Sequence, residues 1–167
     1  MFTHLVVDPT AFGLLLKLGV AIVCGALIGT ERVFSHKSAG MRTYALVSMG
    51  AAIFVIIGDT ILRRYFAEGF NVSDPLQIPS MIISGIGFMG AGMIIFKDTS
   101  VMGLTSASGF WVAAGIGMAA GYGLFTVSVM ATLLTLFIFI ILWHVERHVK
   151  LWSLRRDGMT EECKEDK

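Results

Sequence analysis

The sequence predicts an all-α membrane protein: a polytopic bundle of about five transmembrane helices, with the N-terminus outside and the C-terminus in the cytoplasm. Hydrophobic residues make up 55% of the 167 residues and charged residues only 15%, whereas soluble domains carry about 25% charged residues. The charges are also segregated, so that four long windows hold at most one charge each. Lysine and arginine gather on one side of the predicted helices, which sets their orientation.

The first three windows predict one membrane span each. A helix of about 20 apolar residues crosses the hydrocarbon core of a bilayer. The first window, whose single charge is Lys17, predicts a span over residues 11–29, and the next two predict spans over 42–58 and 76–96. A soluble chain of this size leaves about a third of its unfolded surface exposed, so it cannot hide these windows from water. No lysine or arginine precedes the first window, which argues against a cleaved signal peptide.

The fourth window, residues 99–145, predicts two spans. As one helix it would be roughly 70 Å long at 1.5 Å per residue, about twice the membrane thickness. It must therefore fold back once. The Gly-Tyr-Gly triplet at 121–123 is the predicted reversal, because glycine permits the backbone conformations that end a helix. The window therefore predicts two spans, over residues 105–120 and 124–143.

The positions of the basic residues predict the orientation. With the N-terminus outside, ten lysines and arginines fall on the cytoplasmic side, and only Arg63 and Arg64 lie outside. Residues 1–145 are then a transmembrane domain, and residues 146–167 are a short charged cytoplasmic tail. Lys17, in the outer third of the first span, is predicted to extend its amine to the outer interface.

Small residues recur at helical spacing on three of the predicted spans. These small-residue faces are Ala21, Gly25 and Gly29 on the first span, Ser80, Ser84, Gly87 and Ala91 on the third, and Gly109, Ala113, Gly117 and Gly121 on the fourth. Small side chains let two helix backbones approach closely, and such packing drives helix association in lipid. The pattern predicts a compact bundle. The alternative for the glycine-rich third span is a broken helix that lines a binding site.

A G-x-G-x-x-G pattern occupies residues 85–90. As a dinucleotide fingerprint it requires a preceding strand and a βαβ unit, and neither is predicted, so we reject that interpretation. No nucleophile-and-base set occurs, and the basic residues form no patch interleaved with aromatic residues. We therefore expect neither an enzyme, with a catalytic residue or a cofactor, nor a nucleic-acid partner.

Four charged or polar residues flank the first predicted hairpin. Glu31 and Arg32 follow the first span, and Arg42 and Thr43 begin the second. An ion pair between Glu31 and Arg42 would fix how the two helices leave the membrane. Ordinary positive-inside flanking explains the two arginines equally well, although not the glutamate. No carboxylate lies well inside a span, so we expect no metal site.

Four blocks of the sequence resemble the MgtC/SapB family of bacterial inner-membrane proteins. They are residues 25–32, 39–47, 84–92 and 101–111, which occur in the family's order within residues 10–145. The positions that match the family's motifs are Glu31, Arg32, Arg42, Thr43, Gly85, Gly87, Gly90, Gly92, Thr105 and Trp111.

The resemblance implies a role in magnesium homeostasis and stress adaptation. It implies a multi-pass protein of the inner membrane, tied to growth in low Mg²⁺, acid tolerance and virulence inside host cells. Such a protein would act by helix–helix contact within a homo-oligomer or with another membrane protein, such as the ATP synthase. The alternative is a transporter or channel for Mg²⁺ or another small solute, gated by Glu31 and Arg42. Many members carry a soluble C-terminal domain where this chain has only residues 146–167, which puts any function of that domain in doubt.

Overall fold

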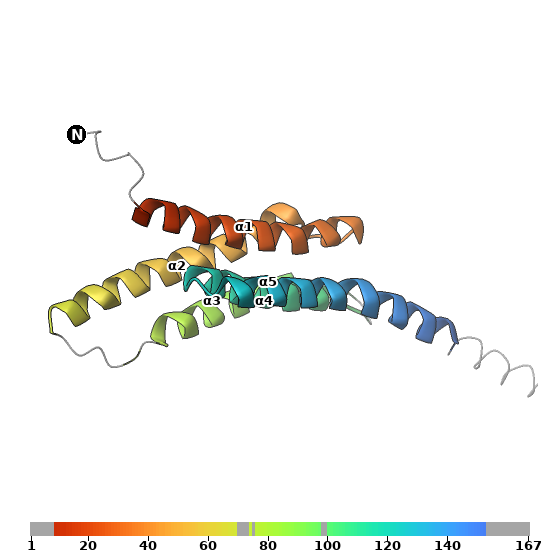
Figure 1. The fold of residues 1–167 in the computed structure, drawn as a ribbon. Helices are drawn as coiled ribbons and strands as arrows, with labels where there is room; N and C mark the ends of the chain where they lie inside the picture. Colours follow the sequence, from red (N-terminus) through yellow and green to blue (C-terminus); the bar gives the residue numbers. More distant parts are fainter. Residues whose placement is uncertain (1–8, 70–73, 75, 98–99, 153–167) are drawn as a thin grey trace, which may run out of the picture. The chain divides into compact units, whose positions relative to one another are not determined.

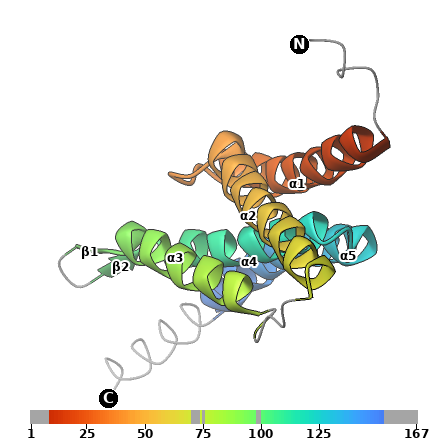
Figure 2. The same ribbon diagram turned by 90° about the vertical axis from the view of Figure 1, so that its left-hand side faces the viewer.

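The computed structural model confirms the all-helical prediction. It describes residues 9–69, 74, 76–97 and 100–152. Within these residues the α-helices are α1 (Pro9–Phe34), α2 (Met41–Ala67), α3 (Gln77–Met93), α4 (Leu104–Gly121) and α5 (Phe125–Phe137) (Figure 1). A π-helical segment, η1 (Ile138–Leu142), continues α5, and two short strands, β1 (Ile95–Lys97) and β2 (Ser100–Met102), form an antiparallel hairpin (Figure 2). The chain divides into two compact units, one ending at Thr135 and one beginning at Leu136.

Among the described residues, three helices are long and apolar enough to cross a membrane. They are Ala11–Phe34, Met41–Ala67 and the continuous helix Phe125–Trp152. α3 and α4 have only 17 and 18 residues and are rich in glycine, alanine and serine. Large apolar side chains are nevertheless exposed on all of these helices, among them Leu15, Phe54, Phe88, Leu104 and Leu133. Such a surface is stable in hydrocarbon and costly in water, so the structure is that of a helical membrane protein.

The core of the first unit lies where α1, α2 and α4 meet. Ala21, Ala52 and Ala120, one from each helix, are fully buried against one another. A Cβ atom added to Gly25 would lie 2.6 Å from the Tyr44 carbonyl oxygen of α2. On α4, a Cβ atom at Gly121 would lie 2.8 Å from the Ala52 carbonyl oxygen. The small-residue faces of α1 and α4 therefore bring both helices into backbone contact with α2, as the compact-bundle prediction requires.

The predicted reversal of the fourth window is confirmed. α4 ends at Gly121, and Gly123 has a φ angle of +79°, which favours glycine. The Ser128 hydroxyl of α5 then donates a hydrogen bond to the Ile116 carbonyl oxygen of α4 at 3.1 Å. A Cβ atom at Gly123 would lie 3.6 Å from Cε of Lys17, so this lysine extends beside the turn.

The helices differ in length from several predicted membrane spans, whose bounds in the bilayer stay predictions. α1 runs to Phe34 rather than to residue 29, and α2 runs to Ala67 rather than to residue 58. Neither extension contains proline, and an Asp59–Arg63 ion pair of 2.8 Å at i,i+4 spacing supports the second. The third span was predicted to reach residue 96, but α3 ends at Met93 and the β-hairpin follows.

The predicted tail also begins as helix. Residues 146–152 continue the last helix, where Lys150 and Glu146 form an i,i+4 ion pair of 2.6 Å. The His144 ring contacts the Ile140 carbonyl oxygen at 2.7 Å, one helical turn earlier. The rest of the tail, residues 153–167, lies outside the described residues.

Candidate functional site

The end of α1 carries a buried ion pair between neighbouring residues. Both Nε and Nη2 of Arg32 contact Oε2 of Glu31. The Ser35 hydroxyl donates a hydrogen bond to the other carboxylate oxygen, Oε1, at 2.6 Å. The side chains of Arg32 and Glu31 are only 4% and 11% exposed. Since α1 continues to Phe34, both charged residues lie inside the helix rather than in the loop after it, and the pair sits against the bundle.

Tyr44 connects this end of the bundle to α4. It is fully buried and lies within electrostatic reach of both Glu31 and Arg32. Its hydroxyl donates a hydrogen bond to the Ser106 carbonyl oxygen at 3.3 Å. Its ring packs edge-to-face on Phe110, with 5.0 Å between the ring centroids. The phenol of α2 thus contacts the first turns of α4 and lies within electrostatic reach of the ion pair of α1, and we call these groups together the buried polar cluster.

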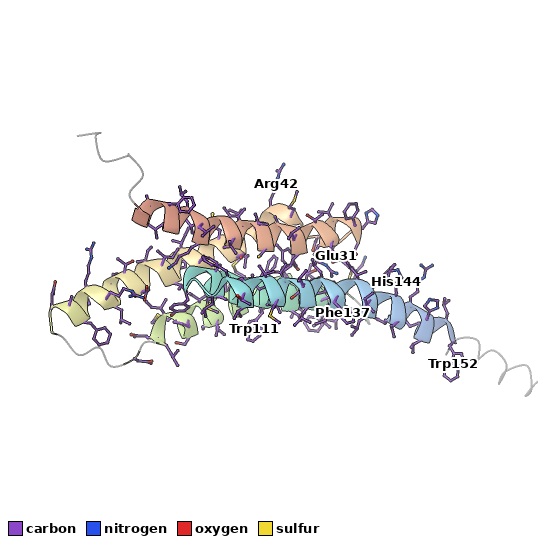
Figure 3. All side chains as sticks on the ribbon, in the orientation of Figure 1. Glu31, Arg42, Trp111, Phe137, His144 and Trp152 are labelled. Atoms are coloured by element: carbon purple, nitrogen blue, oxygen red, sulfur yellow. The ribbon has the colours of Figure 1, made fainter. Side chains whose placement is uncertain are left out.

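Arg42 does not belong to the buried polar cluster. Its side chain is exposed and points away from the helices, whereas Glu31 lies on the inner side of α1 (Figure 3). Within the described part of the chain, Glu31 contacts Arg32 and Ser35, and Arg42 makes no ion pair. The proposed Glu31–Arg42 pair is therefore wrong. Positive-inside flanking still accounts for Arg42, while Glu31 compensates the buried Arg32.

The motif glycines of α3 have different surroundings. Gly90 is buried, and a Cβ atom there would lie 3.6 Å from Cβ of Ala107 on α4. Gly85, Gly87 and Gly92 are exposed, and a Cβ atom at any of them would meet nothing within 4 Å. Gly90 thus serves the packing of α3 on α4, while the other three leave open surface.

The remaining motif residues lie apart from the ion pair. Thr105, in the first turn of α4, is exposed. Trp111 is 55% exposed and points outward from α4 (Figure 3). Thr43 is half-buried at the start of α2. The structure therefore brings Glu31 and Arg32 together in an ion pair, whereas Thr43 and Gly85 line a separate apolar groove between α2 and α3.

Sequence reasoning missed three residues of the buried polar cluster. Tyr44, Ser106 and Phe110 lie inside blocks that resemble the family, but none of them is among the predicted site residues. The available signal was a tyrosine in the first turn of an apolar helix. It lies close to a glutamate that positive-inside flanking does not explain. A buried phenol needs a hydrogen-bond partner, which predicts a polar neighbour for Tyr44.

Replacing Tyr44 with phenylalanine should lower the free energy of unfolding by about 1 kcal/mol. The change keeps the ring contact with Phe110 but removes one hydrogen bond and leaves the Ser106 carbonyl oxygen without that donor. Unfolding by SDS in mixed micelles measures the loss. Tyr122→Phe is the matched control, because Tyr122 is 42% exposed whereas Tyr44 is fully buried, and the two variants should differ in unfolding free energy.

Comparison with known proteins identifies the chain's relatives. It is 39% identical over 122 residues to the protein slr0014 of Synechocystis, covering 73% of this chain and 49% of that protein. It is 40% identical over 97 residues to protein MgtC of Salmonella typhimurium, covering 58% of this chain and 38% of that protein. It is 39% identical over 92 residues to the putative magnesium transporter YhiD of Escherichia coli, covering 53% of this chain and 40% of that protein.

The matched regions leave much of each relative uncovered. The chain spans about half or less of the length of these curated relatives. No solved structure matches it. The sequence profile of the MgtC family matches residues 18–148, which include all five α-helices in part or whole. This chain belongs to the MgtC family.

Proposed function

We propose that the chain is a multi-pass protein of the bacterial inner membrane that supports adaptation to low magnesium, acid or intracellular stress. It acts without enzymatic chemistry, by contact between one of its helices and a helix of a membrane partner. Membership of the MgtC family and the name of the YhiD relative support a connection to magnesium. The observation that carries the mode of action is the unoccupied small-residue face of α3.

Three small-residue faces were predicted, and two of them are used within the chain. Those of α1 and α4 bring these helices into backbone contact with α2. The third face, on α3, consists of Ser80, Ser84, Gly87 and Ala91, and all four residues are exposed. No described helix covers it. Because small residues on a membrane helix favour close helix pairing, this face suits a partner helix outside the chain.

The free face of α3 is distinct from the surface that α3 presents to its own chain. Gly87 and Gly85 lie about 160° apart around the helix at 100° per residue. Gly90, which packs on Ala107 of α4, lies about 60° from Gly87. A Cβ atom at Gly87 would nevertheless meet nothing within 4 Å, so a substitution there alters the free face rather than the contact of Gly90 with α4. A second copy of the chain, or another membrane protein such as the ATP synthase, supplies the partner helix.

Replacing Gly87 with leucine should abolish partner binding without unfolding the chain. A Cβ atom there would meet nothing within 4 Å in the chain, whereas a leucine side chain prevents close approach of a second helix. Co-purification of differently tagged copies, and of other membrane proteins, measures binding, and growth of a deletion strain in low Mg²⁺ measures function. Both should fall to the level of the empty vector.

Gly85→Leu is the matched control for assembly, since it adds the same bulk to another face of the same helix. It should leave co-purification unchanged. If Gly87→Leu assembled and supported growth as the wild type does, the proposal would be refuted.

The transport alternative is tested with the same purified protein. Liposomes that contain it and a Mg²⁺-sensitive dye should show no Mg²⁺ entry above that of empty liposomes under an inward gradient. Flux that Glu31→Gln alters would instead assign the buried ion pair a role in transport and overturn the proposed mode of action.

A further inference from the structure

The β-hairpin lies at the same end of the bundle as the buried polar cluster. β1 follows α3 and β2 precedes α4, within the first unit of the chain. Just beyond β2, the Ser106 carbonyl oxygen in the first turn of α4 accepts the hydrogen bond from Tyr44 at the start of α2. Figure 2 shows the hairpin beyond the ends of both α3 and α4. The hairpin therefore marks how far the α3–α4 pair reaches at this end.

α3 and α4 are too short to cross a bilayer unaided. With 17 and 18 residues they extend about 25 Å and 27 Å at 1.5 Å per residue, whereas the hydrocarbon core is about 30 Å thick. Each strand of the hairpin adds three residues, which is about 10 Å of extended chain. The hairpin therefore carries the α3–α4 pair to the level where hydrocarbon ends and lipid headgroups begin.

The polarity of the hairpin rises from its base to its tip. All six strand residues are exposed. From the helices outward, the cross-strand pairs are Ile95 with Met102, Phe96 with Val101, and Lys97 with Ser100. The two pairs nearest the helices are apolar, and the pair at the tip brings an ammonium group and a hydroxyl. One leaflet of a bilayer has the same order, with hydrocarbon first and charged headgroups beyond it.

The two kinds of group in the hairpin need different surroundings. Its strands make up the whole of the described sheet, so each strand has one edge whose N–H and C=O groups pair with no other strand. Open sheet edges are too costly for the hydrocarbon core, which excludes a deeply buried hairpin. Phe96 is 79% exposed, and such a side chain is costly in water, which argues against a hairpin in the cytoplasm. Only the boundary between lipid and water suits both.

We propose that the β-hairpin is an interfacial anchor, with its base among the acyl chains of the cytoplasmic leaflet and its tip among the headgroups. Phe96 and Val101 share one face because they are a cross-strand pair, and this face contacts the acyl chains. The Lys97 amine contacts the phosphates of anionic lipids.

The anchor fixes the depth of α3, which carries the free small-residue face. A Cβ atom at Gly103, just after β2, would collide with the Met93 carbonyl oxygen at the end of α3. This close approach joins the base of the hairpin to α3, so the two move together. The anchor rests on the predicted orientation of the chain and does not depend on a partner helix.

Spin labels on single cysteines test the anchor in liposomes of phosphatidylethanolamine and phosphatidylglycerol. The full chain, with Cys24 and Cys163 replaced by alanine, carries one cysteine at a hairpin position. Electron paramagnetic resonance measures how often the label collides with oxygen, which concentrates in hydrocarbon, and with a nickel chelate, which stays in water. The ratio of oxygen to chelate collisions should fall from the pair at the base to the pair at the tip. Labels on the two residues of one pair should give equal ratios.

Two exposed positions calibrate the ratio. Phe88→Cys on α3 gives the value in hydrocarbon, and Lys37→Cys in the loop between α1 and α2 gives the value in water. Hairpin ratios equal to that at Lys37 would place the hairpin in water and overturn the proposal. A label at Phe96 that neither reagent reaches would show that protein covers this face, which would overturn it as well.

A carboxylate in the apolar base should dislodge the anchor. With the label at Val101, Phe96→Asp should lower the ratio to the value at Lys37, because a charge is costly among acyl chains. Ser100→Asp is the matched control, since it adds the same charge at the tip, and it should leave the ratio unchanged. Gly87→Leu should also leave it unchanged, so the anchor and the partner helix are tested separately. Equal ratios in Phe96→Asp and Ser100→Asp would show that the leaflet does not hold the hairpin.

Discussion

Replacing Gly117 with leucine is expected to abolish the folded bundle. Gly117 is buried on the face of α4 that meets α2, and a Cβ atom there would collide with the Ser48 carbonyl oxygen. That oxygen belongs to the backbone of a helix, so it cannot swing aside as a flexible side chain would. One turn later, Gly121 is confined in the same way by Ala52 and Val55. Any added side chain must therefore push α4 away from α2 along this contact.

The expected loss of unfolding free energy for Gly117→Leu is at least about 3 kcal/mol, the upper end of ordinary overpacking. The yield of a monodisperse species from membranes in mild detergent, followed by SDS unfolding, measures it. Gly115→Leu is a matched control, because it lies two residues earlier on α4 and its Cβ atom would meet nothing within 4 Å. Wild-type stability of Gly117→Leu would show that α2 and α4 do not pack as closely as described.

The fold was predictable where local chemistry alone decides the outcome. The absence of charge from residues 99–145 required a reversal, and the two glycines at 121–123 placed it correctly. The end of α3 was not predictable in this way. Ile94, Ile95 and Phe96 are apolar, so the sequence pattern does not distinguish them from the end of a span. Gly103 has a φ angle of +91°, and a Cβ atom there would collide with the carbonyl oxygen of Met93, the last residue of α3. This close approach of two separate segments is a tertiary constraint, which the local sequence does not reveal.

The small-residue faces show where sequence reasoning reaches its limit. Spacing identified such faces on α1, α3 and α4 alike. Only the arrangement in space shows that two of them pack on α2 while the face containing Gly87 stays open. The period of a helix says which residues share a face, but not which neighbour that face meets.

The buried ion pair illustrates the same limit for the candidate site. The partner of Glu31 depends on how far α1 continues, because the helix decides which side chains turn inward. With α1 ending at residue 29, Glu31 would lie in the loop and within reach of Arg42. With α1 continuing to Phe34, Glu31 and Arg32 face the bundle together. Whether residues 30–34 are helical therefore decides which residue pairs with Glu31.

Replacing Arg32 with leucine is expected to destabilise the protein by about 3–5 kcal/mol, the usual cost of removing one partner from a buried ion pair. The change leaves the Glu31 carboxylate, whose side chain is 11% exposed, with the Ser35 hydroxyl but without its compensating charge. SDS unfolding in mixed micelles measures the loss.

A second change separates the lost charge balance from the lost packing. Adding Glu31→Gln to Arg32→Leu should restore part of the stability, because the amide needs no counter-charge while it keeps the shape of the glutamate. Arg42→Leu is the control for the loss of an arginine at the same end of the bundle. Because Arg42 is exposed, its replacement should change the unfolding free energy by no more than about 0.5 kcal/mol. If Arg32→Leu and Arg42→Leu were equally stable, the ion pair would not hold this end of α1 in place. A double variant no more stable than Arg32→Leu would instead assign the loss to the packing of the arginine stem.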